Sequence, residues 1–278
     1  MKASRIIAAL IWTTTLLGNH VAKAANRITV KGSDTMVILA QRWAEAYMKK
    51  NPGIRIQVTG GGSGTGIAAL INGTTDICDS SRPLKPQEVA RLKARWRQEP
   101  YEVKCAKDGL AIYVNKANPI TSLTMQQIKD IYTGKINNWK EVGGKNMKIT
   151  RYSRENNSGT YVYFKEHVLE KQDYHPDCQN MPGTAAVVNA VAKDPSGIGY
   201  GGIAYAREIK VISVKQDATS PAYQPTAANV KSGKYPISRY LFMYTRGFPQ
   251  GEVKRYIDWC LSSEGQKIVS QVGYFRVK

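Results

Sequence analysis

Short apolar runs alternate with amphipathic segments along most of the chain. Arg27 to Lys31 and Ile54 to Thr59 have the length and composition of strands. Met36 to Lys50 repeats apolar residues at helical spacing, and Asn51-Pro52-Gly53 ends that helix. The alternation continues, with strands predicted at 76–78, 110–115, 148–152, 197–202, 209–214 and 240–244 and helices at 67–71, 85–97, 124–132, 159–170, 184–192 and 251–261. This order predicts an α/β architecture with mostly parallel sheets.

The first 24 residues have the pattern of a secretory signal peptide. Lys2 and Arg5 precede a mostly apolar run from Ile6 to Leu17, and Ala22-Lys23-Ala24 offers small residues for cleavage. The apolar run is too short to span a bilayer as a helix. We therefore expect an exported protein, and the remaining length of about 254 residues suits two modest domains or one large one.

The chain is strongly basic, with a formal net charge of +19. Three of the basic residues and none of the acidic ones lie in the first 24, so the rest carries +16. Such a surface attracts anions, from nucleic acid and lipopolysaccharide to small oxyanions. The densest cluster, Arg91 to Arg97, is more typical of a solvated helix face. Nucleic-acid binding is supported by charge alone, since no aromatic and basic recognition motif accompanies it.

The cysteines and histidines give no metal-binding pattern. An exported protein with four cysteines has room for two disulfides in three connectivities, or for buried free thiols, and the sequence leaves both open for Cys78, Cys105, Cys178 and Cys260. His167 and His175 are not spaced as metal ligands. An exported phosphoester hydrolase is disfavoured, because Ser63 lacks the Gly-x-Ser-x-Gly spacing. We expect no metal, no cofactor and no enzymatic activity.

Three loops share one design, a strand followed by small hydroxyl residues and then a helix. They are Gly32 to Thr35, Gly60 to Gly66 and Arg154 to Thr160. Free backbone N–H groups and the positive end of a helix dipole favour an anion at such a junction. A single loop of this kind is explained by helix capping. Three of them, one with an arginine, favour a shared oxyanion site at the carboxyl ends of the strands.

In these segments the chain resembles the periplasmic phosphate-binding proteins of phosphate ABC transporters (the PstS family). The resemblance extends to Asp76–Pro83, Leu123–Trp139 and Gly197–Tyr205. It implies a two-lobed type II periplasmic binding protein, monomeric, that delivers phosphate to a membrane-embedded permease. We expect lobe 1 to comprise residues 25–107 and 206–278, lobe 2 residues 108–205, and the hinge to lie near 107–109 and 205–210.

The same resemblance implies which residues contact the ligand. The family's contacts fall here on Ser33, Asp34, Thr35, Ser63, Arg154, Ser158, Gly159 and Thr160. One position departs from well-known members, which have an aspartate that accepts a proton from the ligand where this chain has Arg82. We expect Arg82 to add a second positive charge to the site, with a structural ion pair as the alternative.

Selectivity then needs another proton acceptor, because hydrogen phosphate carries a proton and sulfate does not. Asp34 is the first candidate and Asp79 the second, although Asp34 also suits a helix cap. Another tetrahedral oxyanion, such as sulfate or molybdate, is the nearest alternative ligand.

Overall fold

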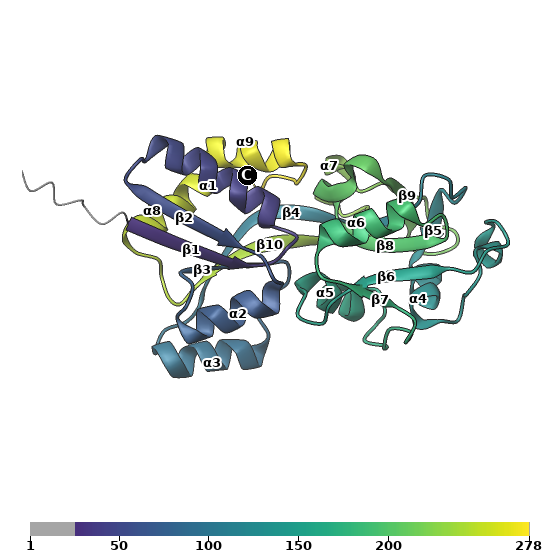
Figure 1. The fold of residues 1–278 in the computed structure, drawn as a ribbon, viewed down its shortest axis with the longest axis horizontal. Helices are drawn as coiled ribbons and strands as arrows, with labels where there is room; N and C mark the ends of the chain where they lie inside the picture. The colour runs from purple at the N-terminus through teal and green to yellow at the C-terminus, as the bar shows by residue number, and fades with distance from the viewer. Residues whose placement is uncertain (1–25, 278) are drawn as a thin grey trace, which may run out of the picture.

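The computed structural model describes residues 26–277, so the predicted signal peptide lies outside the described part. These residues form two lobes that share one 10-stranded sheet in the order β2-β1-β3-β10-β4-β8-β6-β7; off this path, β9 pairs with β4 and β5 pairs with β9 (Figure 1). Each lobe is a mixed sheet flanked by helices, which confirms the predicted two-lobed α/β class. Within residues 26–277, no helix is long and apolar enough to cross a membrane.

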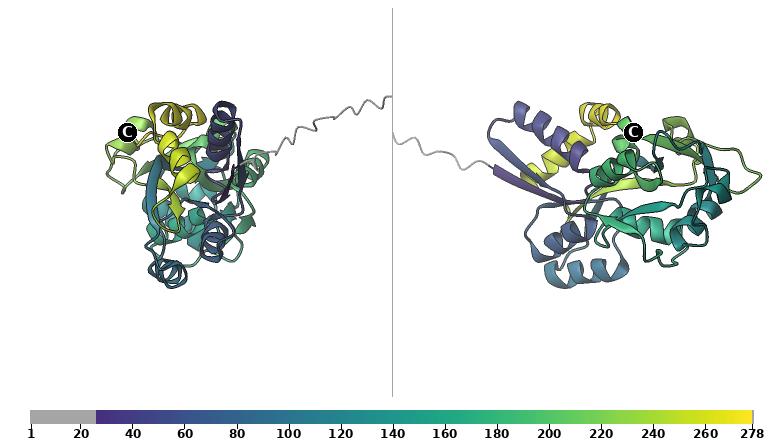
Figure 2. Two further views of the ribbon diagram at one scale, coloured as in Figure 1. Left: turned by 90° about the vertical axis from the view of Figure 1, so that its left-hand side faces the viewer. Right: turned by 45° about the vertical axis from the view of Figure 1, so that its right-hand side comes forward.

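Lobe 1 is built on a parallel core of three strands with helices on both sheet faces (Figure 2). Its strands are β1 (Asn26–Gly32), β2 (Ile54–Thr59), β3 (Ile77–Ser80) and the neighbouring halves of β4 (Tyr101–Val114) and β10 (Ser238–Thr245). Helices α1 (Val37–Lys50), α8 (Gly251–Cys260) and α9 (Ser263–Val272) share one hydrophobic core, and α2 (Ser63–Asn72) and α3 (Pro86–Trp96) share the other.

Lobe 2 continues the sheet beyond β4. It contains the strands β5 (Ser122–Thr124), β6 (Thr150–Arg154), β7 (Gln179–Met181), β8 (Gly197–Gly202) and β9 (Lys210–Lys215). Its helices are α4 (Met125–Thr133), α5 (Gly159–His167), α6 (Thr184–Lys193) and α7 (Ala227–Lys231), with 3-10 turns η1 (Trp139–Val142) and η2 (Ile203–Glu208).

Strands β4 and β10 carry the chain between the lobes. They pair antiparallel from Ser238 opposite Gly109 to Thr245 opposite Tyr101. Strand β9 pairs with the lobe 2 half of β4, and Val230 and Ile237 pack in the lobe 2 core. The chain therefore returns to lobe 1 near Ser238, which corrects the expected return at residue 206. The first crossing, expected at 107–109, lies within β4.

Local sequence explains the helices that present the site. Helix α1 buries one side, including Leu39, Trp43 and Tyr47, and ends at Asn51 before Pro52. Helix α2 starts at Ser63, four residues earlier than predicted, and ends at Gly73, which has a positive φ of 78°. The four cysteines are free thiols, so the disulfide alternative is not realised in this structure.

Candidate functional site

Three helices from both lobes point their N-termini at one place. Helix α1 follows Thr35, α2 begins with Ser63 and α5 begins with Gly159. The Ser158 hydroxyl caps α5 by accepting bonds from the backbone N–H groups of Thr160, at 3.2 Å, and Tyr161, at 3.3 Å. The positive ends of three helix dipoles therefore meet between the lobes, which favours a bound anion.

Four buried hydroxyls connect the lobes at this point. Thr35 Oγ1 of lobe 1 lies 2.9 Å from Thr160 Oγ1 of lobe 2, and Thr160 Oγ1 lies 3.5 Å from Ser81 Oγ. Ser81 Oγ lies 3.3 Å from Ser63 Oγ, and the Ser81 backbone N–H also donates to Ser63 Oγ at 3.1 Å. We call these four residues the hydroxyl cluster. Hydroxyls rotate freely and both donate and accept, so together they can donate to several oxygens of one anion.

A buried arginine adds positive charge to the hydroxyl cluster. Arg239, in β10, donates from Nη2 to Thr160 Oγ1 at 3.0 Å and from Nη1 to the Ser81 carbonyl at 3.0 Å. Its Nε and Nη2 also donate to Asp108 Oδ2, at 3.1 and 3.0 Å. Asp108 is fully buried in β4, so its carboxylate holds the guanidinium in place.

Arg154 and Asp34 form a second charged link between the lobes. Arg154 Nη2 donates to Asp34 Oδ2 at 2.6 Å, and its Nη1 donates to Thr184 Oγ1 at 3.0 Å. The other carboxylate oxygen of Asp34 accepts from the Gly61 backbone N–H at 2.7 Å. Helix α1 has Met36 at its N-cap with no side-chain cap bond, so Asp34 does not cap it. A carboxylate oxygen accepts more than one bond, so Asp34 keeps acceptor capacity.

The Gly-rich loop lets the two lobes approach closely. Gly62 has a positive φ of 89°, and a Cβ there would lie 2.8 Å from the Asn157 carbonyl oxygen of lobe 2. That carbonyl accepts from the Gly64 backbone N–H at 2.8 Å. A Cβ on Gly159 would overlap the Ser63 hydroxyl and lie 2.7 Å from Ser81 Oγ. Glycine at these two positions is what allows backbone and hydroxyl groups of both lobes to meet.

The structure brings together every predicted contact except Arg82. Ser33 is buried two residues before Thr35 in the chain, and its backbone N–H donates to the Asp79 carbonyl at 2.9 Å. Arg82 instead donates from Nη1 and Nη2 to Glu88 of α3, at 2.8 and 2.7 Å. Burial is the largest single influence on the Glu88 carboxyl and raises its pKa, but the bonds from Arg82 and the Lys85 backbone and the charges of both residues together hold the pKa below its ordinary value. This geometry corrects the expected role of Arg82 and matches its structural alternative.

Sequence reasoning missed one residue of the hydroxyl cluster, Ser81, and the arginine bonded to it, Arg239. Ser81 stands beside Arg82 in a segment that the family resemblance already marked, and its position directly after strand β3 is the signal that could have found it. Arg239 follows Ser238 directly before the apolar run Tyr240–Tyr244, with no motif around it. We found no sequence signal for it.

Asp79, the second candidate acceptor, lies close to Cys105, Tyr256 and Cys260 of the lobe 1 core. Its residue is almost fully buried, and its Oδ1 has no hydrogen-bond partner within residues 26–277. Burial raises the pKa of this carboxyl to about 8. Asp79 is therefore a neutral acid at neutral pH in the folded protein, which makes it a poor acceptor for a ligand proton.

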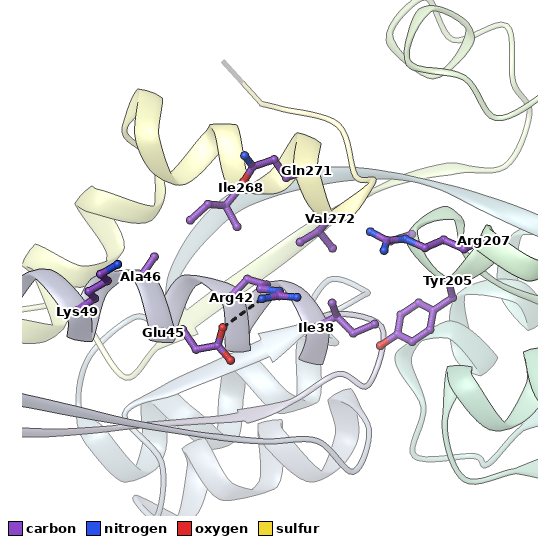
Figure 3. Close-up of a pocket in the computed structure, with 11 residues that line it drawn as sticks. Ile38, Arg42, Glu45, Ala46, Lys49, Tyr205, Arg207, Ile268, Gln271 and Val272 are labelled. Atoms are coloured by element: carbon purple, nitrogen blue, oxygen red, sulfur yellow. Dashed lines mark hydrogen bonds and ion pairs between the residues drawn. The ribbon is translucent and has the colours of Figure 1, made fainter.

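A separate cavity of about 610 Å³ lies between α1, α9 and η2 (Figure 3). Its lining is apolar at Ile38, Ala204 and Val272, and Arg42 and Arg207 lie at its charged rim. Tyr205 extends from η2 into this cavity and donates its hydroxyl to the Asp34 carbonyl at 2.6 Å. An apolar lining does not suit a small oxyanion, whereas the hydroxyl cluster offers several buried donors.

The arrangement can hold a small tetrahedral oxyanion. Hydroxyls, two arginines and three helix ends supply donors and positive charge, and burial strengthens each interaction. Within the described part of the chain, no group of histidine, cysteine or acidic side chains suits a metal ion.

The chain is similar to known proteins along most of its length. Residues 18–264 match the model of the PBP superfamily domain. The chain is 31% identical to the phosphate-binding protein PstS of Pseudomonas aeruginosa, with 99% of this chain and 95% of that protein aligned. It is 34% identical to the phosphate-binding protein PstS of Bacillus subtilis, over 92% of this chain and 82% of that protein.

Among solved structures, a putative phosphate ABC transporter substrate-binding protein from Clostridium perfringens with bound phosphate is similar. Its TM-score is 0.82 at 33% identity, and the alignment covers 91% of this chain and all of that one.

Proposed function

The chain belongs to the phosphate-binding proteins of ABC transporters within the PBP superfamily, and we propose that it captures inorganic phosphate at the hydroxyl cluster between its lobes. The observation that carries this assignment is the chain of hydroxyls from Ser63 and Ser81 through Thr160 to Thr35. It joins both lobes and is bonded to Arg239. A ligand that replaces these contacts draws the lobes together.

In the proposed site, each predicted residue has a distinct part. Thr35, Ser63, Ser81 and Thr160 donate hydroxyl protons to phosphate oxygens. Ser33 supplies its hydroxyl, because its backbone N–H is bonded to Asp79. The N-termini of α1, α2 and α5 supply backbone N–H groups, which Ser158 and Gly159 position in α5. Arg239 supplies charge directly. Arg154 adds charge-assisted bonds while it holds Asp34.

Asp34 is the proposed source of phosphate selectivity. Its carboxylate lies between the lobes, where it accepts bonds from Arg154 of lobe 2 and from Gly61 of the Gly-rich loop. A ligand O–H satisfies its remaining acceptor capacity, whereas sulfate offers no proton. The mismatch costs roughly 1–3 kcal/mol when a buried polar group is left unpaired. Sulfate and molybdate remain the alternative ligands that competition would reveal.

The proposed cellular role is capture outside the cytoplasm followed by delivery to a membrane-embedded permease. The relatives are binding proteins of transporters, and the basic surface suits a protein that collects anions. We propose a monomer in the periplasm. Of the histidines in residues 26–277, His167 contacts the Tyr163 carbonyl at 3.0 Å and His175 packs beside Gly134.

Equilibrium binding of labelled phosphate, challenged with excess sulfate, tests this assignment. We expect saturable binding of one phosphate that excess sulfate does not displace. Displacement by equal concentrations of sulfate or molybdate would transfer the assignment to that anion. No binding of any of the three would overturn it.

A further inference from the structure

A second basic site lies on the strands that join the lobes. In β10, Leu241 and Met243 pack into the core beneath α8 and α9, so Tyr240 faces the opposite side of the sheet. Tyr240 is half-buried and pairs across the strands with Lys107 of β4. This face of the two crossing strands is open to solvent at Lys104.

Two cations lie over the Tyr240 ring, and two more line a cavity beside it. Lys104 Nζ lies 4.8 Å from the ring centroid and Lys107 Nζ lies 5.1 Å from it. Lys107 and Tyr240 also line a cavity of about 190 Å³ together with Lys231 of α7 and Arg276 of the C-terminal segment. We call these five residues the hinge patch. They come from four separate parts of the chain, so local sequence does not explain their convergence.

The charge of the hinge patch is unbalanced. Among residues 26–277, none of its four cations lies within ion-pair distance of an acidic side chain, and Arg276 donates only to the Ser270 hydroxyl, at 2.9 Å. A cation over an exposed aromatic ring gains only about 0.5–1 kcal/mol. Mutual repulsion opposes the gathering of like charges, and a bound anion would relieve it.

The chemistry of the hinge patch differs from that of the hydroxyl cluster. Its donors are ammonium and guanidinium groups with no hydroxyl besides that of Tyr240, so it recognises charge rather than a tetrahedral shape. The cavity holds the volume of about six waters at about 30 Å³ each, which suits a group of two joined phosphates. An anion with several charges fits it better than a single phosphate.

We propose that the hinge patch binds a clustered phosphate anion, for which inorganic pyrophosphate is the smallest example. Lys231 ends α7 of lobe 2, Arg276 is bonded to Ser270 of the lobe 1 helix α9, and Lys107 and Tyr240 belong to the crossing strands. A ligand that contacts all four residues favours one relative position of the two lobes. Its binding therefore changes the affinity of the hydroxyl cluster for phosphate, and phosphate changes the affinity of the hinge patch by the same factor.

The test is calorimetric titration of pyrophosphate into protein already saturated with phosphate, which occupies the hydroxyl cluster. We expect one additional binding event that weakens at least about tenfold in the double variant Lys231→Glu/Arg276→Glu. The control double variant Lys116→Glu/Lys193→Glu changes two exposed lysines and alters net charge equally. It should change pyrophosphate affinity by less than about twofold.

Phosphate affinity, measured in parallel, should stay the same in both double variants, and this separates failure of the hinge patch from failure of the phosphate assignment. A vesicle arm with phosphatidic acid distinguishes the source of the phosphates. Vesicle binding that depends on Lys231 and Arg276, without binding of free pyrophosphate, would assign the patch to a lipid headgroup and overturn the free ligand. Binding of neither probe, or equal loss in both double variants, would overturn the site.

Discussion

Arg154 of lobe 2 donates to the Asp34 carboxylate of lobe 1 across 2.6 Å, although 120 residues separate them in the chain. Arg154 is buried, and its other bonds, to Thr184 and the Met181 carbonyl, fix its guanidinium in lobe 2. The pair therefore forms only when the lobes are close, and it lies beside the hydroxyl cluster where the ligand would be held.

Replacing Arg154 with alanine should weaken phosphate binding at least about tenfold, which corresponds to about 1.4 kcal/mol. The variant loses both the charge at the site and the link to Asp34. Isothermal titration of phosphate measures the effect, and Arg207→Ala, which removes an exposed arginine from η2, is the matched control. An Arg154→Ala protein with unchanged affinity would contradict the assigned role.

Asp34→Asn should reduce the preference for phosphate over sulfate. Asparagine keeps an oxygen for the Gly61 N–H but offers a weaker acceptor to a ligand O–H and carries no charge. We expect the ratio of the two dissociation constants to fall by about fivefold or more. Competition titration at pH 7 gives this ratio. If the affinities for phosphate and for sulfate fall by the same factor, the proton acceptor is a residue other than Asp34.

Substitutions of Arg239 and Arg82 should affect phosphate affinity and protein stability differently. Arg239→Gln should weaken phosphate binding at least about tenfold, because it removes a donor bonded to Thr160. It also leaves Asp108 buried without its cation, which typically costs about 3–5 kcal/mol of stability. The double variant Arg239→Gln/Asp108→Asn should regain much of that stability without regaining affinity.

Arg82→Gln provides the contrast, because its guanidinium is bonded to Glu88 rather than to the cluster. We expect a lower free energy of unfolding and a phosphate affinity within about twofold of the parent. Urea unfolding and calorimetry measure the two quantities. A tenfold loss of affinity in a stable Arg82→Gln protein would restore Arg82 to the site.

The sequence predicted the parts of the site that local patterns encode. Strand, hydroxyl loop and helix follow one another within a few residues, so Thr35, Ser63 and Thr160 could be placed at helix N-termini without a structure. Ser81 and Arg82 show the limit of that reasoning. They are neighbours in the chain, yet one side chain joins the cluster and the other turns to Glu88 at the start of α3.

Contacts between distant segments were beyond prediction. Arg239 reaches Thr160 across 79 residues from a strand with no polar motif. The lobe boundary near Ser238 depends on pairing of β9 with β4, which periodicity does not reveal. The first half of β4 was also missed, because this strand is exposed at Tyr101 and Glu102 and its burial pattern changes along its length. Helix α9 was missed as well.

The buried carboxyl of Asp79 should make stability depend on pH. Its pKa in the folded protein is about 8, against an ordinary value of 3.8. Between these values the folded state holds a proton that the unfolded state has lost, so stability falls as pH rises from about 4 to about 8. The slope approaches about 1.4 kcal/mol per pH unit, and above about pH 8 the contribution no longer changes.

Urea unfolding of the parent and Asp79→Asn proteins at several values between pH 5 and pH 8 measures this slope. The variant should lose it, because asparagine does not titrate, so its stability relative to the parent should rise with pH. Asp217→Asn is the control. Hydrogen bonds from Thr219 and Ser220 lower the pKa of Asp217 to about 2, so this carboxyl changes stability only at pH values below those measured. Parallel curves for parent and Asp79→Asn would show that Asp79 is already ionised in the folded protein, and that an unseen partner satisfies it.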